Sequence, residues 1–369
     1  MRIGLDATPL LGPRTGIGRY VEHLLAALAQ PRSGDEFVAT AFTARGAGGL
    51  AATLPAGVSA RGRPVPARGL RWVWERSELL PVELLTGRLD VFHGTNFVLP
   101  PSGAVGVLTV HDLAYLRHRE TVSADSARLP DLVGRGIARA AVVCTPSSAV
   151  AQEVLETYAL PSDRVVVTPL GVDPSWAAAR PLPTARSAEL GLTEPYLLFV
   201  GNVEPRKNLP MLLRAYAAAH ATSAGDLPTL ALAGPAGWGP PLEVPPQLAS
   251  RIVRLGYLGQ AELQQVVAGA RALVFPSRYE GFGLPPLEAF ATGVPVLAAD
   301  IAAVRETVGS LAHLVGPEDE DGWAAAMLAT GGAHDAAGAE ADRRAVAARY
   351  TWAATAQRTV DAYRRAADR

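Results

Sequence analysis

Two glutamates and two glycines share one segment that follows a run of apolar residues. Glu280 and Glu288 are separated by seven residues, and Ala272–Phe275 before them has the apolar character of a buried strand. Pro286 suits the first position of a helix, which places Glu280 in a loop and Glu288 in the first helical turn. Carboxylates at these two positions can accept hydrogen bonds from hydroxyl groups.

Backbone amides lie between the two glutamates. Because Gly281 and Gly283 carry no side chain, we expect the amides of Gly283 and Leu284 to face outward at a helix N-terminus, where an anion binds readily. This order of groups fits a sugar–diphosphate–ribose ligand. The simpler interpretation makes Glu288 an acid favoured by the helix dipole and Glu280 a surface charge.

A cationic pair follows another predicted strand. Arg206 and Lys207 are adjacent in the loop after Tyr196–Val200. A guanidinium can bind two phosphate oxygens and an ammonium adds a point charge, so the pair can hold a diphosphate without a metal ion. The alternative is a solvated pair that caps the next helix.

The composition excludes several classes of protein. With 34 basic and 35 acidic residues the formal net charge is −1, which gives no bulk electrostatic reason to bind nucleic acid. The single cysteine, Cys144, can form neither an intramolecular disulfide nor a cysteine metal cluster. Residues 318–321 contain a D-x-D pattern, but their place before a predicted helix favours capping over metal binding.

The N-terminal residues, the length of the apolar runs and one arginine-rich segment indicate the cellular compartment of the protein. No apolar leader follows Met1 and no run approaches ~20 apolar residues, so we expect a cytoplasmic protein. Arginines interleave with Trp72 and Trp74 between residues 61 and 76. We expect the tryptophans to pack beneath a helix and the arginines to be solvated. The alternative is an acceptor-binding or membrane-surface patch, with peripheral contact to the inner face of the membrane.

Apolar runs alternate with helical patterns in two successive blocks, which is typical of parallel sheets covered on both faces. The first block has predicted strands at 2–5, 37–42, 91–93, 105–110, 141–145 and 165–168, a glycine-bearing loop at 12–18, and helices at 20–30, 125–138 and 147–158. The second has strands at 196–200, 229–233, 252–255, 272–275 and 296–299, and helices at 210–220, 261–268, 287–292 and 323–330. We therefore predict an α/β chain with two Rossmann-like, doubly wound domains. The domains are 1–175, joined by the final helix 351–369, and 195–350, with a linker at 176–194.

The segment 275–289 resembles the E-x7-E motif of the retaining GT-B glycosyltransferases of family 4. The resemblance spans nearly the whole chain and is strongest over residues 196–306. It implies that Glu280 contacts the donor sugar and Glu288 the ribose hydroxyls. It also implies an interdomain cleft, a last helix that returns to the first domain, and retention of the anomeric configuration.

Other segments extend the resemblance. It implies that Arg206 and Lys207 bind the donor diphosphate, and that the loop carrying Gly16 approaches the donor phosphates. The family often has two successive glycines in that loop, whereas this chain has Thr15 before Gly16, which puts the detailed loop geometry in doubt.

Two more positions match less specific parts of the family. His111 follows a predicted strand, and the resemblance implies a hydrogen bond near the donor sugar. Asp112 could cap a helix or orient His111. Leu258 lies in a loop that resembles the one bordering the nucleotide base.

These residues predict a hexosyltransferase that uses a nucleoside diphosphate sugar and a hydroxyl acceptor, with His111 and Glu280 catalytic and no metal required. Residues 91–100 resemble members that use GDP-mannose, and a UDP-sugar is the other expected donor. The acceptor is a glycan, a lipid-linked saccharide or a small molecule, with no nucleic acid partner. The alternatives are a nucleotide-sugar epimerase of the same architecture and a non-enzymatic two-domain sugar-binding protein.

Overall fold

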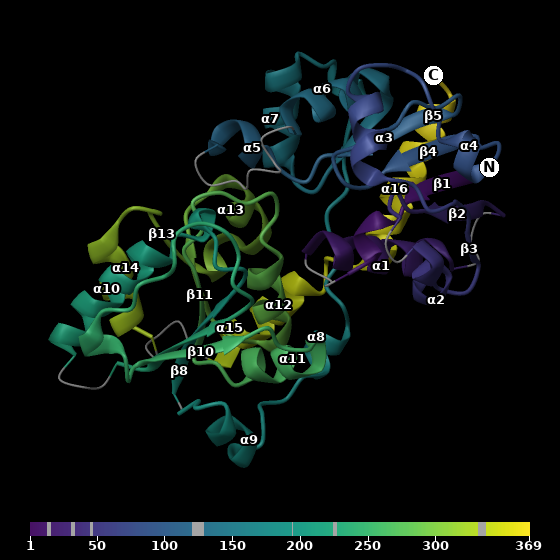
Figure 1. The fold of residues 1–369 in the computed structure, drawn as a ribbon. Helices are drawn as coiled ribbons and strands as arrows, with labels where there is room; N and C mark the ends of the chain where they lie inside the picture. The colour runs from purple at the N-terminus through teal and green to yellow at the C-terminus, as the bar shows by residue number, and fades with distance from the viewer. Residues whose placement is uncertain are drawn as a thin grey trace. The chain divides into compact units, whose positions relative to one another are not determined.

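Two parallel β-sheets with surrounding helices organise the chain (Figure 1). The computed structural model describes residues 1–12, 16–30, 34–44, 47–119, 129–193, 195–223, 227–330 and 337–369. The described residues form two units. The first is drawn from Met1–Leu116, Asp125–Gly171 and Thr351–Arg369, and the second from Arg117–Ala124 and Val172–Tyr350.

The first sheet has seven strands in the order β3-β2-β1-β4-β5-β6-β7, all paired in parallel. The strands are β1 (Arg2–Asp6), β2 (Glu36–Thr40), β3 (Val58–Ala60), β4 (Val91–Gly94), β5 (Val105–Thr109), β6 (Ala140–Thr145) and β7 (Val165–Val167). The strand order reverses between β1 and β4. Their carboxyl ends therefore form the topological switch point, where ligands bind in doubly wound sheets.

The second sheet has six strands in the order β10-β9-β8-β11-β12-β13, again all parallel. The strands are β8 (Tyr196–Val200), β9 (Thr229–Ala233), β10 (Ile252–Gly256), β11 (Ala272–Phe275), β12 (Val296–Ala299) and β13 (His313–Val315). Here the order reverses between β8 and β11, so the loops after these two strands meet at the switch point.

The α-helices alternate with the strands, as the two-block pattern predicts. They are α1 (Gly16–Leu28), α2 (Leu50–Thr53), α3 (Ala67–Trp74), α4 (Glu83–Thr86), α5 (Ala114–Arg117), α6 (Leu129–Arg139), α7 (Ser148–Tyr158), α8 (Ser175–Ala178), α9 (Thr184–Glu189), α10 (Leu209–Thr222), α11 (Gln260–Ala268), α12 (Leu284–Thr292), α13 (Ala302–Val308), α14 (Glu320–Leu328), α15 (Ala337–Ala347) and α16 (Trp352–Ala367). No helix among the described residues is long and apolar enough to cross a membrane.

Successive strand residues of the first sheet enter different cores. Val91 and Val107 pack in a cluster with α1 and α16, whereas Phe92 and Leu108 pack in a cluster with α3 and α6. This alternation follows from the two-residue period of a strand, and it confirms a sheet covered on both faces. Cys144 lies in the first of these cores, and burial raises the pKa of its thiol to about 12.

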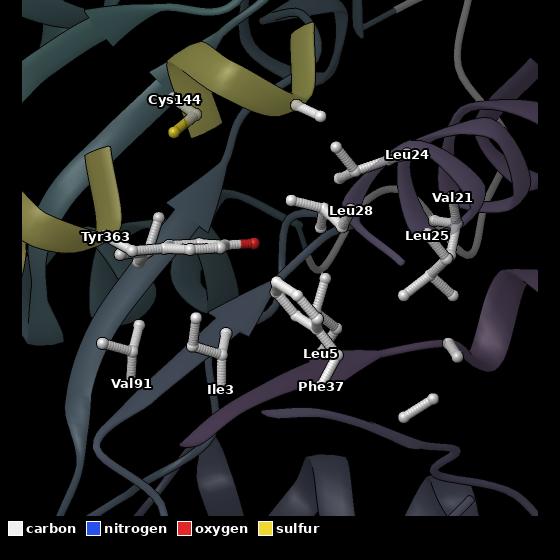
Figure 2. Packing of buried hydrophobic residues seen from close by; sticks show 14 of the residues in the cluster. Ile3, Leu5, Val21, Leu24, Leu25, Leu28, Phe37, Val91, Cys144 and Tyr363 are labelled. Carbon is white, nitrogen blue, oxygen red and sulfur yellow. The ribbon is translucent and has the colours of Figure 1, made fainter. Parts of the chain in front are cut away.

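The C-terminal helix α16 belongs to the first unit, as the family resemblance implies. Figure 2 shows Tyr363 of this helix among apolar side chains of the first strands and α1. The Tyr363 hydroxyl is 2.7 Å from Nδ1 of buried His93, whose Nε2 is 2.7 Å from Thr109 Oγ1. At Gly171 a Cβ atom would lie 2.2 Å from the backbone nitrogen of Trp352, so only glycine allows this close approach.

Some predicted boundaries require correction. The helix predicted from residue 20 begins at Gly16, and residues 125–128 of the helix predicted at 125–138 lie outside the described residues. β3 and β13 were not predicted, because Ser59 and His313 leave neither three-residue strand a continuous apolar run. Within the expected linker 176–194, the described residues belong to the second unit and include α9.

Candidate active site

The loops after β8 and β11 come together because these two strands are neighbours in the second sheet. The Arg278 backbone amide donates to the Arg206 carbonyl at 3.0 Å, and Arg206 Nη1 donates to the Tyr279 carbonyl at 2.8 Å. Arg206 and Lys207 therefore lie beside Glu280, the first glutamate of the E-x7-E segment, although they are more than 70 positions away from it in the chain.

Four charged side chains form what we call the switch-point cluster: Glu204, Arg206, Lys207 and Glu280. Glu280 accepts from Arg206 Nη1 at 2.8 Å and from Lys207 Nζ at 2.7 Å, and Glu204 accepts from Arg206 Nη2 at 2.8 Å. The Arg206 and Lys207 side chains are only 16% and 11% exposed, so the solvated-pair interpretation is wrong. Two carboxylates balance two cations, so the cluster carries no net charge.

Burial acts in the same direction on the pKa of Glu280 and Glu204, but the neighbouring cations offset it to different extents. Burial by itself would raise the pKa of Glu280, but the charges of Arg206 and Lys207 outweigh it and lower the pKa to about 2. Burial also raises the pKa of Glu204, and there the same two cations offset only part of the effect. Glu280 is therefore ionised throughout the physiological pH range.

Sequence reasoning missed Glu204. It stands two positions before Arg206 in the same loop, and it is 5% exposed. The residues Pro205–Lys207 form a 3-10 turn that begins directly after Glu204. A carboxylate two positions before a cation in a post-strand loop is the signal that could have found it.

The start of α12 differs from the prediction. The helix begins at Leu284, with Gly283 at φ +99° as its N-cap, so Glu288 lies in the second turn and is 7% exposed. Both Pro285 and Pro286 fit inside the helix because residues of the first turn have no intrahelical use for an N–H group. Neither proline has an N–H group, so the first turn of α12 has two fewer hydrogen-bond donors. The backbone amides of Gly283, the N-cap, and Leu284, the first helical residue, remain able to bind an anion. No described residue accepts a hydrogen bond from either amide.

His111 lies after β5 in the first unit. Its Nε2 donates to the Thr95 carbonyl at 2.8 Å, so a neutral ring carries its proton on Nε2 and its lone pair on Nδ1. Burial lowers its pKa, although the Thr95 bond and Asp112 oppose that shift, and this favours the neutral ring. Asp112 instead accepts from the Ala114 amide at 3.0 Å, at the start of α5.

The remaining predicted positions lie in separate places. Gly16 is the first residue of α1 and is exposed, whereas Thr15 lies outside the described residues. Leu258 is buried between β10 and α11 in the second unit. Asp319 caps α14 by accepting from the Gly322 amide at 2.9 Å, which confirms capping for the acidic run. In the described ranges no group of three His, Cys, Asp or Glu residues could hold a metal ion.

Comparisons with known proteins agree with this architecture. The family model "Glycosyltransferase Family 4" matches residues 14–176, and "Glycosyl transferases group 1" matches residues 194–330. The chain is 31% identical over 354 residues to O-antigen chain mannosyltransferase B of Escherichia coli, covering 89% of this chain and 90% of that protein. It is 31% identical over 312 residues to D-inositol 3-phosphate glycosyltransferase of Nocardia farcinica (strain IFM 10152), covering 76% and 67%.

Solved structures share the fold at low sequence identity. Anabaena HepE, solved in complex with UDP and glucose, superposes with a TM-score of 0.70 at 18% identity over 98% of both chains. Sucrose-phosphate synthase from Thermosynechococcus elongatus gives 0.68 at 20% identity over 98% of both chains. The fold and the matches together define a GT-B hexosyltransferase. The chain belongs to glycosyltransferase family 4, which decides for a transferase over an epimerase or a non-enzymatic binding protein.

Proposed function

We propose that the protein transfers mannose from a nucleoside diphosphate sugar, with GDP-mannose as the first candidate, to a hydroxyl group of a glycan. The observation that carries the donor assignment is the switch-point cluster beside the N-terminus of α12. It joins two cations, two carboxylates and two available amides at the place where doubly wound sheets bind nucleotides. The second unit then holds the donor and the first unit the acceptor.

The cluster suits a diphosphate because its cations are already held in place. A diphosphate would share Arg206 and Lys207 with Glu280, and its negative charge would be spread over both cations and the α12 amides. In the transition state the leaving diphosphate gains charge, so these preorganised donors lower the barrier. Because two cations supply this neutralisation, the proposal needs no metal ion.

Glu280 and His111 are proposed to hold the donor sugar. Glu280 stays ionised with Arg206 and Lys207, so it can accept hydrogen bonds from sugar hydroxyls while it keeps the cations aligned. The Nδ1 lone pair of His111 can accept another sugar hydroxyl, because Nε2 is already bound to Thr95. Retention of the anomeric configuration is proposed from the family resemblance. Gly16 and Leu258 are proposed to border the donor phosphates and base.

The lean toward mannose rests on relatives. The match to O-antigen chain mannosyltransferase B covers most of this chain and most of that protein. Residues 91–100 also resemble members of the family that transfer mannose. Anabaena HepE has been solved with UDP-glucose, so a UDP-sugar remains the second candidate. Among acceptors, a glycan is favoured over a lipid-linked saccharide or a free metabolite by the same mannosyltransferase relative.

Glu288→Ala is expected to weaken donor binding about tenfold or more, because it removes a carboxylate proposed to bind the ribose hydroxyls. Thermal stabilisation of the protein by GDP-, UDP-, dTDP- and ADP-sugars, each with and without EDTA, measures this. One nucleotide should raise the melting temperature of the wild type in both conditions.

Glu243→Ala, at an exposed loop position of the same unit, is the matched control and should keep the wild-type shift. Equal donor affinity in Glu288→Ala and the control would contradict the ribose assignment. A shift that EDTA abolishes would contradict metal independence.

An exposed apolar patch supports peripheral membrane contact. Trp74 is buried as expected, but the expectation for Trp72 is wrong: it is 55% exposed, and Leu79, Leu80 and Leu84 are 68%, 45% and 66% exposed. Arg76 lies over the Trp72 ring at 4.8 Å, and Arg68 is also exposed. We propose that the exposed side chains from Trp72 to Leu84, which we call the 72–84 patch, dock on an anionic phospholipid bilayer, because apolar side chains beside an arginine fit its headgroup boundary.

Arg76→Glu combined with Trp72→Ser is expected to abolish co-sedimentation with vesicles that contain phosphatidylglycerol, because it removes both the buried apolar area and the cation. Arg365→Glu, exposed on α16, is the control for the change of charge alone. The proposal fails if the double variant sediments like the wild type, or if the wild type does not sediment at all.

A further inference from the structure

Two aromatic side chains flank the ring of His111 in the first unit. The Tyr20 ring of α1 lies 4.8 Å from the His111 ring, centroid to centroid, at an interplanar angle of 82°. The Phe97 ring, in the segment after β4, lies 5.6 Å from it at an angle of 76°. Both contacts are edge to face, an arrangement that aromatic rings favour. Together with the bond from Nε2 to the Thr95 carbonyl, they hold the imidazole at three points.

Phe97 has a backbone conformation that is unfavourable for a bulky residue. Its φ is +62°, in the left-handed region that side chains other than glycine rarely adopt. Gly94, the last residue of β4, allows the chain to fold back here, because a Cβ atom on it would lie 2.2 Å from the Val98 carbonyl oxygen. Strained residues cluster at functional sites, where the surrounding structure imposes the conformation. The strain at Phe97 therefore indicates a role beyond filling the core.

One residue of β5 fixes both aromatic residues. Thr109, two positions before His111, accepts from the Phe97 amide at 3.2 Å, and its hydroxyl oxygen lies 3.1 Å from that of Tyr20. The same hydroxyl oxygen lies 2.7 Å from Nε2 of His93. Thr109, Tyr20 and His93 are each at most 3% exposed. Because buried hydrogen-bond networks are rigid when their members are paired, the two flanking rings have a fixed position relative to the end of β5, where His111 lies.

We infer that Tyr20 and Phe97 are positioning residues for the transfer reaction, which restrain the His111 ring so that its Nδ1 lone pair keeps one direction. Tyr20 is 3% exposed and Phe97 is 8% exposed, so both act through His111 rather than on a ligand. A side chain that binds a reacting group has to be held within about 0.5 Å of its working position, and three contacts on one imidazole supply that restraint. The inference rests on the proposed role of His111 and names the residues that hold it.

The flanking rings also keep water away from the imidazole. Burial lowers the pKa of His111, and Asp112 acts in the opposite direction. Tyr20 and His93 stay uncharged at neutral pH, because burial raises the pKa of the tyrosine and lowers the pKa of the histidine to about 3. Tyr20→Leu or Phe97→Leu leaves space for water beside the imidazole, so the pKa of His111 should rise in either variant.

The kinetic test uses the full chain with GDP-mannose as donor and α-linked mannobiose as acceptor. Tyr20→Leu and Phe97→Leu are each expected to lower kcat about tenfold or more, because a misplaced group at the reacting centre has that effect, and to change the donor KM less than about twofold. Tyr20→Phe keeps the ring and should recover most of kcat. Phe37→Leu is the matched control and should keep the wild-type kcat, because Phe37 is 4% exposed and lies on β2, which β1 and β4 separate from β5.

Histidine ¹⁵N NMR of the labelled protein, without donor or acceptor, separates this inference from the proposed function. The His111 signals, identified by their loss in His111→Gln, should report one Nε2–H tautomer in the wild type and in Phe37→Leu. Tyr20→Leu and Phe97→Leu should give mixed tautomers and a titration midpoint at higher pH, even if no nucleotide sugar is used. Wild-type tautomer and midpoint in both variants, or a kcat in both equal to that of Phe37→Leu, would overturn the inference. Phe97→Leu alone decides if Tyr20→Leu does not fold.

Discussion

Arg206→Ala is expected to lower kcat/KM about 10²–10³-fold, the cost typical of removing one preorganised donor from a developing oxyanion. Arg206 is the centre of the switch-point cluster, because it contacts Glu204, Glu280 and the Tyr279 carbonyl. Its loss removes a proposed phosphate donor and also leaves Glu204 buried without that partner. Initial rates over a range of GDP-mannose concentrations measure the effect.

Arg206→Lys separates charge from geometry. A lysine keeps the charge but cannot bind two oxygens in one plane, so we expect only partial recovery of activity. Arg214→Ala on α10 is the control, because its side chain is 57% exposed and pairs with surface Glu320. If Arg206→Ala and Arg214→Ala retained the same kcat/KM, Arg206 would have no role in diphosphate binding.

Glu280→Gln is expected to lower the free energy of unfolding by about 3–5 kcal/mol at neutral pH, because it leaves Arg206 and Lys207 partly buried without their shared carboxylate. It should also reduce kcat, since the donor sugar loses a charged acceptor. A nucleoside diphosphate should stabilise this variant at least as much as the wild type, because the ligand replaces the missing negative charge. Urea unfolding with and without GDP measures both effects.

The same variant has a pH signature. Because the folded pKa of Glu280 is lowered to about 2, its contribution to stability is present above the unfolded pKa of ~4.3 and is lost as pH falls from there to about 2. Glu280→Gln should lack this loss. Glu318→Gln breaks only an exposed pair with Arg278 and should cost less than about 1 kcal/mol. An identical acid-unfolding profile in Glu280→Gln and the wild type would contradict the pairing.

The strand boundaries could be predicted from the sequence where a strand is buried on both faces. The strands at 196–200, 229–233, 272–275 and 296–299 agree residue for residue with β8, β9, β11 and β12, because a strand buried on both faces is a continuous apolar run. β3 and β13 contain Ser59 and His313, so they have no such run. Helix starts were less predictable, because two prolines are compatible with the first turn of α12.

The candidate site could be predicted only as residue types. Glu280, Glu288, Arg206 and Lys207 were found from their post-strand positions and the family motif, but the sequence assigned the cations only to the donor diphosphate and predicted no protein partner for them. The structure shows both of them bound to Glu280 and adds Glu204. This pairing depends on β8 and β11 being neighbours, and strand order is a property of the sheet that local patterns do not contain.

The sequence by itself determined the two-block α/β pattern, the family motif and the chemical groups available to a nucleotide sugar, because these depend on neighbouring residues. Only the tertiary structure decided which charges neutralise each other, that Trp72 is exposed while Trp74 is buried, and that Tyr20 and Phe97 flank His111. These features depend on distances between residues far apart in the chain. Such distances are set by sheet order and by the packing of helices on each face.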